Sequence, residues 1–228
     1  IDDFPHEIAI LSLYLAKHQM NIDFEQQFGR EIKLIPLKDN AKIVHGNAAR
    51  LDWNEVCPNM PHKAGIKTGP EQSALIDFGD EPLELELEEE TWDEIYLISN
   101  PPYLGSRNQD KVQKEDLSLV TSQYKSLDYI SIWFIKGAQF LGKNPNAGLA
   151  FVSTNSITQG EQVSILWPDI LKGKEIGFAH TSFKWSNSAR GQAGVTCVII
   201  SLRNVSAKPK FLITGMFKSE VTQINAYL

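Results

Sequence analysis

Cysteine is scarce in this chain of 228 residues, where Cys57 and Cys197 are the only two and lie far apart. Neither has a second Cys or a His at the spacing of a metal site, which argues against zinc and against a disulfide framework. Free thiols are typical of a reducing compartment, so a cytoplasmic protein is expected. Long apolar runs are absent as well, and no basic-then-apolar signal opens the chain, so no membrane partner is expected.

Glycine-rich turns are also absent. A nucleotide-binding α/β fold has such a turn between its first strand and the following helix, because the backbone must approach the ligand closely there. None of the 15 glycines lies in a glycine-rich turn that follows a predicted strand and precedes a predicted helix. We therefore expect the first strand and its glycine-rich loop to precede residue 1, which makes the chain an amino-terminally truncated fragment.

Basic side chains are missing from residues 71–94, which contain eleven acidic residues. This block explains the net charge of −6, a sign that does not suit a self-sufficient DNA-binding protein. The rest of the chain has 22 basic and 17 acidic side chains, a net charge of +5, which suits a nucleic-acid partner. Residues 54–94 are rich in Pro and Gly and then in acid, and we interpret them as an insertion whose acidic run is a solvated face.

Apolar strands and helices alternate along the chain. A helix capped by Asp3 opens it, and residues 21–31 are expected to hold the end of this helix and a loop. Strand and helix alternation predicts an α/β fold with a doubly wound, mostly parallel sheet, in which the last two strands form a hairpin. Strands are predicted at 32–37, 42–44, 95–98, 147–153, 176–183 and 195–202, a hairpin of 74–78 with 83–87 inside the insertion, and helices at 127–141 and 161–171.

The most informative stretch is Asn100-Pro101-Pro102-Tyr103, which ends the strand of residues 95–98. Open α/β folds bind their ligands at the carboxyl ends of strands. The prolines stop the strand, and Asn100 is extended because it precedes a proline, so its amide lies beside the Pro101 carbonyl. Two acceptors beside an aromatic ring can hold a planar amine. They favour the positive charge that the nitrogen gains as it attacks an electrophile, while Tyr103 stacks on the ring.

This motif resembles that of the S-adenosylmethionine-dependent amino-methyltransferases, in particular the DNA adenine-N6 methyltransferases, which have a Rossmann-like class I fold closed by an antiparallel hairpin. The resemblance implies that Asn100, Pro101, Pro102 and Tyr103 form the catalytic motif. Asn100 and Pro101 would bind the target amine, and Tyr103 would stack on an adenine flipped out of DNA. The implied reaction requires no metal. Similar turns also serve methyltransferases of RNA bases and of protein glutamine.

The same resemblance implies a site for S-adenosylmethionine. Ile1 matches the residue that covers the cofactor adenine, and the acid that holds the ribose would precede it. Asn47 and Ala48 match a polar residue and its neighbour that contact the adenine, with Asp52 as a second candidate, and a plain turn capped by Asn47 is the alternative. Asn100 is expected to adjoin the cofactor too. The cofactor site is expected to be incomplete in this chain.

Aromatic and basic residues that follow the motif extend the comparison. Phe183, at the end of the strand of residues 176–183, matches an aromatic residue that stacks on the other side of the target base, with Trp185 as second choice and core packing as the alternative. Lys111, Lys114 and Lys125 suit either phosphate contact or an ordinary exposed helix.

These features predict a catalytic core over residues 1–214, with residues 215–228 beginning a following segment. The chain looks most like the methylase portion of a single-chain restriction-modification enzyme. The complete enzyme would bind double-stranded DNA and carry nuclease and target-recognition domains, whereas this fragment alone is expected to be inactive. An RNA-base or protein-glutamine methyltransferase and a non-catalytic DNA-recognition module are the alternatives.

Overall fold

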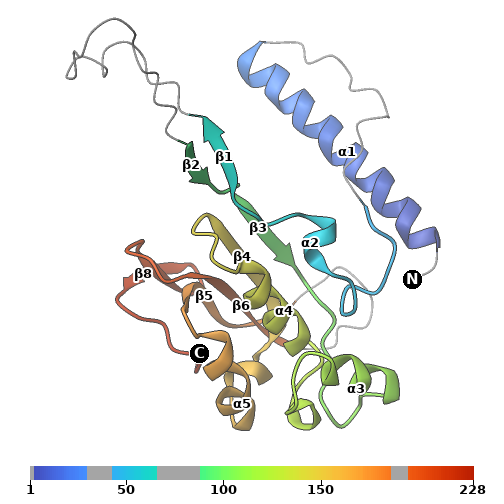
Figure 1. Ribbon diagram of the computed structural model, residues 1–228, viewed down its shortest axis with the longest axis vertical. Coiled ribbons are helices and arrows are strands. Elements are labelled where there is room, and N and C mark those ends of the chain that lie inside the picture. Colours follow the sequence, from blue (N-terminus) through green and yellow to red (C-terminus); the bar gives the residue numbers. More distant parts are fainter. Residues whose placement is uncertain (1–2, 30–42, 66–87, 186–194) are drawn as a thin grey trace, which may run out of the picture. The chain divides into compact units, whose positions relative to one another are not determined.

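The computed structural model describes residues 3–29, 43–65, 88–185 and 195–228. The chain divides into two compact units, Ile1–Pro58 and Asn59–Leu228 (Figure 1). The expected strand at 32–37 and the expected hairpin of 74–78 with 83–87 lie outside the described residues. No helix of the described part combines the length and the apolar character needed to cross a membrane.

The first unit contains a long helix, α1 (Asp3–Phe28), and a short one, α2 (Trp53–Val56). Helix α1 ends inside the predicted stretch 21–31. Gly29 follows it with φ of +62° and donates its backbone N–H to the Glu25 carbonyl at 2.8 Å, a left-handed end that glycine adopts without steric cost. The strand predicted at 42–44 is not formed at residues 43 and 44, which pair with no strand in the described part of the chain.

A six-stranded mixed sheet forms the second unit, with strand order β3-β4-β6-β5-β7-β8. Strands β3, β4, β5 and β7 run in one direction, and β6 and β8 run in the other. The last two predicted strands do form an antiparallel pair, β5 with β6. The strands of this sheet are β3 (Ile95–Ser99), β4 (Ala147–Thr154), β5 (Lys174–Lys184), β6 (Thr196–Asn204), β7 (Lys210–Thr214) and β8 (Phe217–Val221).

The helices of the second unit are α3 (Lys111–Ser118), α4 (Ser131–Leu141) and α5 (Glu161–Ile170), with 3-10 turns η1 (Tyr124–Ser126) and η2 (Asn155–Thr158). Helix α4 begins four residues later than the predicted 127. The reason is Asp128, whose carboxylate accepts a hydrogen bond from the Ile130 backbone N–H and holds residues 128–130 in a turn before the helix.

The core of the second unit lies between the sheet and α4 and α5. Strand β4 alternates buried and half-buried residues, and Phe151 on its buried face meets Phe134 of α4 edge-on at 5.4 Å between ring centroids. Phe134 in turn lies against Trp167 of α5. Gly137 permits the close approach of α4 to β4, because a Cβ at this position would lie 2.5 Å from the Leu149 side chain.

The buried Asn144 side chain joins Asn59 and Asp93 to the turn between α4 and β4. Its Nδ2 donates to Asn59 Oδ1 at 2.8 Å and to the Asp93 carbonyl at 2.9 Å, and its Oδ1 accepts from the Asn146 backbone N–H at 2.8 Å. Residues 62–65 and 88–91, strands β1 (His62–Gly65) and β2 (Glu88–Thr91), pair as an antiparallel two-stranded sheet between these anchor points.

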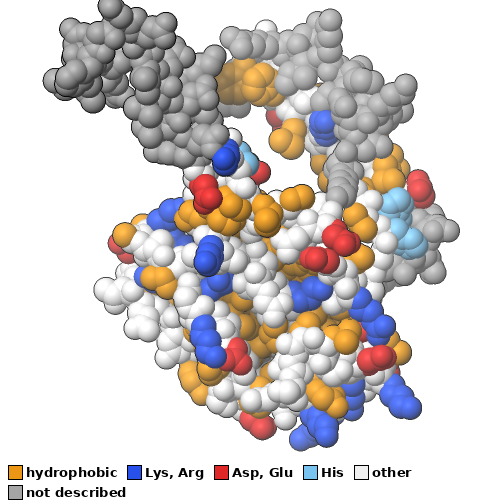
Figure 2. Space-filling model, viewed as in Figure 1, with side chains coloured by type: hydrophobic (Ala, Val, Ile, Leu, Met, Phe, Trp, Pro, Cys, Tyr) orange, Lys and Arg blue, Asp and Glu red, His pale blue; other side chains and the backbone are white. Residues whose placement is uncertain are grey.

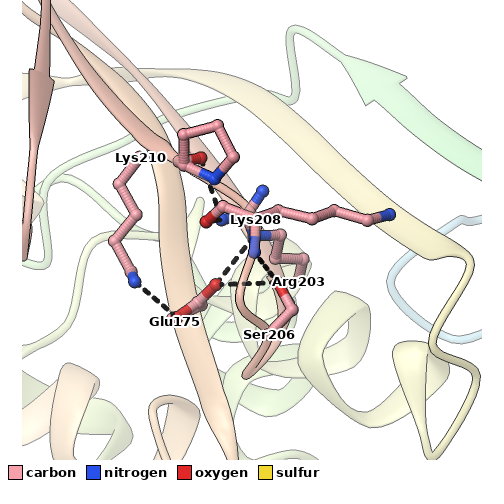
Figure 3. A network of polar contacts seen from close by, with 6 residues as sticks. Glu175, Arg203, Ser206, Lys208 and Lys210 are labelled. Atoms are coloured by element: carbon pink, nitrogen blue, oxygen red, sulfur yellow. Dashed lines mark hydrogen bonds and ion pairs between the residues drawn. The ribbon is translucent and has the colours of Figure 1, made fainter.

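The edge of the sheet where β5 and β7 begin carries an ion-pair network (Figure 3). Glu175 accepts from Arg203 Nε at 2.8 Å and from Lys210 Nζ at 3.0 Å, and Ser206 donates to the same carboxylate at 3.2 Å. Burial raises the pKa of Glu175, but the hydrogen bonds and charges of Lys210 and Arg203 outweigh it, so the net pKa is lowered. Arg203 also donates to the Lys208 carbonyl at 2.6 Å, which connects the end of β6 to the start of β7.

Candidate active site

Four strand ends meet at one edge of the six-stranded sheet, which we call the carboxyl edge. Asn100 directly follows β3, and β4 ends beside it at Thr154 because the two strands are parallel. Thr154 lies opposite Cys197 near the start of β6, and Cys197 lies opposite Phe183 near the end of β5. Residues 153–156 therefore lie at the same edge as Asn100.

The Asn100 side chain is exposed at this edge, whereas Pro101 behind it is buried. Pro102 is exposed again and Tyr103 is half-buried. A proline ring buried in the turn holds the backbone in place, because its φ is restricted and it contributes no N–H that would need a partner. The turn thus presents an amide to solvent from a fixed backbone, as a binding group requires.

The loop just after the turn is held by hydrogen bonds to both backbone polar groups of Leu104. Its backbone N–H donates to Asp128 Oδ1 at 2.9 Å, and its carbonyl accepts from the Tyr129 N–H at 3.0 Å and from Gln109 Nε2 at 2.8 Å. The same Gln109 nitrogen also donates to the Leu127 carbonyl at 2.9 Å. Tyr103 is therefore held between a buried proline turn and a hydrogen-bonded loop.

Asp128 connects three segments of the site, and nothing in its sequence context indicated this role. It is 3% exposed, and its two carboxylate oxygens accept from Leu104 N–H, Ile130 N–H and Ser156 Oγ at 2.9, 3.2 and 3.3 Å. These donors belong to the loop after Tyr103, the turn before α4 and the η2 turn after β4. A single buried carboxylate is satisfied by groups that lie far apart in sequence, so only the folded chain reveals it.

Tyr103 and Phe183 are both neighbours of Cys197. Burial raises the pKa of the Tyr103 hydroxyl above its ordinary value, and the Cys197 thiol raises it further, which places the two groups close enough to interact. Burial also raises the pKa of the Cys197 thiol, so Tyr103 and Cys197 are both neutral near pH 7. Tyr103 and Phe183 therefore both bring an uncharged aromatic ring to the carboxyl edge, which suits an uncharged aromatic ligand.

Phe183 belongs to a small aromatic group at the end of β5. Its ring meets that of His180 edge-on at 4.9 Å between centroids and lies 6.3 Å from that of Trp185. The β5–β6 register shifts between His180 and Phe183, and such an irregularity redirects a side chain. Phe183 and Trp185 are half-buried, so part of each ring is accessible to solvent. His180 was not anticipated from the sequence.

The cofactor residues predicted in the first unit lie on one turn. Asn47 Oδ1 accepts from the Ala49 N–H at 3.0 Å, as the capped-turn alternative predicted, and Asn47 and Ala48 are both exposed. Asp52 is also exposed and caps α2, its Oδ1 accepting from the Asn54 N–H at 2.9 Å. Ile1 lies outside the described residues. In the described ranges, no group of three or more His, Cys, Asp or Glu residues is arranged to hold a metal ion.

Comparisons with known proteins point to one family. The model of the MmeI DNA-methyltransferase domain matches residues 1–214. DNA methyltransferase A of Bacillus subtilis (strain 168) is 39% identical over 234 residues, which cover 100% of this chain and 23% of that protein. A solved structure of the Type IIL restriction-modification enzyme MmeI in complex with DNA is 34% identical with a TM-score of 0.77, over 100% of this chain and 28% of that chain. The chain thus spans less than a third of either relative.

Proposed function

The chain belongs to the MmeI DNA-methyltransferase domain family, and from this premise we propose that it is the catalytic core of an enzyme that methylates the N6 amine of adenine in DNA. The mixed α/β sheet, with an antiparallel strand between β4 and β5, fits a Rossmann-like class I methyltransferase. The methyl donor would be S-adenosylmethionine. The complete protein would act on double-stranded DNA within a restriction-modification system, together with nuclease and target-recognition domains.

The observation that carries this proposal is the position of Asn100. Asn100 is exposed directly after β3 and precedes the buried Pro101. It lies at the same edge of the sheet as the ends of β4 and β5. Asn100 Oδ1 and the Pro101 carbonyl would accept the two hydrogens of the adenine amine. Acceptors in these positions stabilise the positive charge that builds on the nitrogen as it attacks, which lowers the barrier of that step.

The target base would lie between Tyr103 and Phe183. Both residues are half-buried at the carboxyl edge, and a flat ring bound between their side chains would contact aromatic carbon on its two faces. Flipping a base out of the duplex costs stacking and pairing energy, and new stacking contacts of about 1–3 kcal/mol per base offset part of it. The loop held at Leu104 keeps Tyr103 in place for this contact.

Asn47, Ala48 and Asp52 are the described residues that would hold the adenosine part of the cofactor. Their exposure fits this role, although one oxygen of Asn47 and one of Asp52 are already used by backbone N–H groups. The cofactor would be bound by the side chains of Asn47 and Asp52 and by the surface of Ala48. When bound, S-adenosylmethionine supplies a sulfonium methyl group. The chain's own contribution is to orient the amine in line with that methyl and to exclude water.

The test is nucleoside analysis of DNA, RNA and protein acceptors after incubation of the full-length protein with methyl-labelled S-adenosylmethionine. We expect label in N6-methyladenine of double-stranded DNA, and its loss in Asn100→Ala while the far-ultraviolet spectrum is unchanged. Asn108→Ala, an exposed asparagine of the following loop, is the matched control and should keep full activity. Label in RNA bases or glutamine instead would assign another substrate, and absence of label in every acceptor would support a non-catalytic module.

A further inference from the structure

A basic groove lies on the second unit between α3 and η1. It has a volume of about 510 Å³ and is lined by Lys111, Lys114, Glu115, Ser118, Tyr124 and Lys125. Lys111 and Lys125 are exposed and Lys114 is half-buried. Figure 2 shows Lys and Arg side chains gathered over the part of the surface where Figure 1 draws α3.

The charge of this groove differs from that of the whole chain. Three lysines and one glutamate line it, whereas the chain carries a net charge of −6. Within the described ranges, the ammonium groups of Lys111, Lys114 and Lys125 take part in none of the ion pairs found. Three ammonium groups and one carboxylate leave the groove with a net positive charge, so an anionic ligand would stabilise the arrangement.

Hydrogen bonds connect the two elements that form the groove to the loop after the Asn100–Tyr103 turn. Helix α3 starts at a capping box in which Asp110 and Gln113 bond each other's backbone N–H groups at 2.8 and 3.0 Å. Gln109, the residue before this cap, holds the Leu104 and Leu127 carbonyls, and η1 ends just before Leu127. Both walls of the groove are therefore attached to the loop that follows Tyr103.

A second attachment lies deeper in α3. Asp116, which is 1% exposed, accepts a hydrogen bond from the Tyr129 hydroxyl at 2.7 Å. Tyr129 is the residue after Asp128 and donates its own N–H to Leu104. The position of the lysines relative to Tyr103 is thus set by two hydrogen-bond routes that meet at the Leu104 carbonyl, and a ligand in the groove would be held in a defined register with the turn.

We propose that this lysine groove binds backbone phosphates of the DNA strand that carries the target base. The inference rests on the proposed function, which it extends by naming a contact surface. Lys111 and Lys114 are three residues apart on a helix, with Cβ atoms roughly 5–6 Å apart, so both can reach neighbouring phosphate oxygens. The Ser118 and Tyr124 hydroxyls supply further donors of the kind that contacts phosphate. Such contacts carry no sequence information; they fix the position of the duplex against the turn.

The test compares the full-length protein with a variant in which Lys111, Lys114 and Lys125 are all changed to Gln. Binding to a fluorescently labelled duplex is measured over a range of salt concentrations. The affinity falls as salt rises, and each phosphate contact contributes about −0.9 to the slope of log affinity against log salt. Loss of three contacts should therefore make this slope less negative by about 2.7. We expect this change on every duplex sequence, with a higher KM for DNA and an unchanged kcat at saturating DNA.

Two control variants separate the groove from charge and from folding. Changing Lys143, Lys172 and Lys208 to Gln removes the same charge from the same unit and should leave the salt slope unchanged. Changing the three groove lysines to Arg keeps the charge and should keep the slope. An unchanged slope in the groove variant, or an equal change in both Gln variants, would overturn the inference. Failure of the unmodified protein to methylate DNA would instead overturn the proposed function.

Discussion

Phe183 of β5 lies directly opposite Cys197 of β6, and Thr154 of β4 lies opposite the same cysteine on its other side. Tyr103, from the loop after β3, interacts with this cysteine as well. Cys197 is completely buried, so a small side chain of the core lies next to the strand end that carries Phe183 and near the loop that carries Tyr103. This arrangement follows from the strand order, in which β6 lies between β4 and β5.

Phe183→Ala should weaken productive binding of the target base. Loss of one stacking contact of about 1–3 kcal/mol corresponds to a rise in KM for DNA of roughly 5- to 150-fold. The measurement is steady-state methylation together with the fluorescence of 2-aminopurine placed at the target position, which reports flipping. Phe217→Ala changes a phenylalanine on β8 that is 80% exposed and should alter neither readout. A normal KM and normal flipping in Phe183→Ala would exclude the stacking role.

Asp128→Ala should destabilise the second unit by about 2–4 kcal/mol. The substitution leaves the Leu104 N–H, the Ile130 N–H and the Ser156 hydroxyl without their acceptor in a buried position. Asp128→Asn keeps one oxygen for the two backbone donors and should cost about 1 kcal/mol. Urea unfolding gives both values. Equal stability of the Ala and Asn variants would show that the carboxylate oxygens do not hold these segments together.

Stability should fall in acid partly through Glu175. Its pKa is lowered in the folded chain: burial raises it, but Lys210 and Arg203 lower it by more. A lowered pKa contributes stability that is complete above the ordinary value of about 4.5 and is lost as the pH falls through the folded value. Glu175→Gln should therefore cost about 2 kcal/mol at pH 7 and progressively less below pH of about 4.5.

Chemical unfolding of the Glu175→Gln variant at a series of pH values between about 7 and 3 measures this difference. Glu220→Gln, an exposed carboxylate on β8, is the control and should change stability little at any pH. A stability difference for Glu175→Gln that stays constant down to pH of about 3 would contradict the assignment, because a protonated Glu175 no longer attracts Arg203 or Lys210.

Asn144 offers a test of how Asn59 and Asp93 are anchored to the turn between α4 and β4. Asn144→Asp replaces a donor to Asn59 Oδ1 and to the Asp93 carbonyl by an acceptor, so it should destabilise the second unit at least as much as Asn144→Ala, by about 2–4 kcal/mol. Asn146→Ala removes an exposed side chain that donates to the Trp92 carbonyl at 3.0 Å and should cost less than about 1 kcal/mol. Thermal unfolding ranks the three variants. A smaller effect for Asp than for Ala would show that donation from Asn144 is not what anchors these two residues.

Strand positions were predicted well from local patterns. The strands at 95–98, 147–153, 176–183 and 195–202 correspond to β3, β4, β5 and β6, because runs of β-branched and aromatic residues between turn signals reflect a buried sheet. The strand at 42–44 was wrong over its described residues, since a short apolar pair forms a strand only where another strand accepts its hydrogen bonds.

The sequence by itself determined where the Asn100–Tyr103 turn lies, because an apolar strand that runs into two prolines must end there and expose the residue before them. It also determined the free thiols and the local basic character around α3. Only the tertiary structure decided that Cys197 separates Thr154 from Phe183, and that Asp128 joins Leu104 to Ser156. Strand order and buried polar contacts join residues far apart in the chain, and no local periodicity encodes which distant partner satisfies a given group.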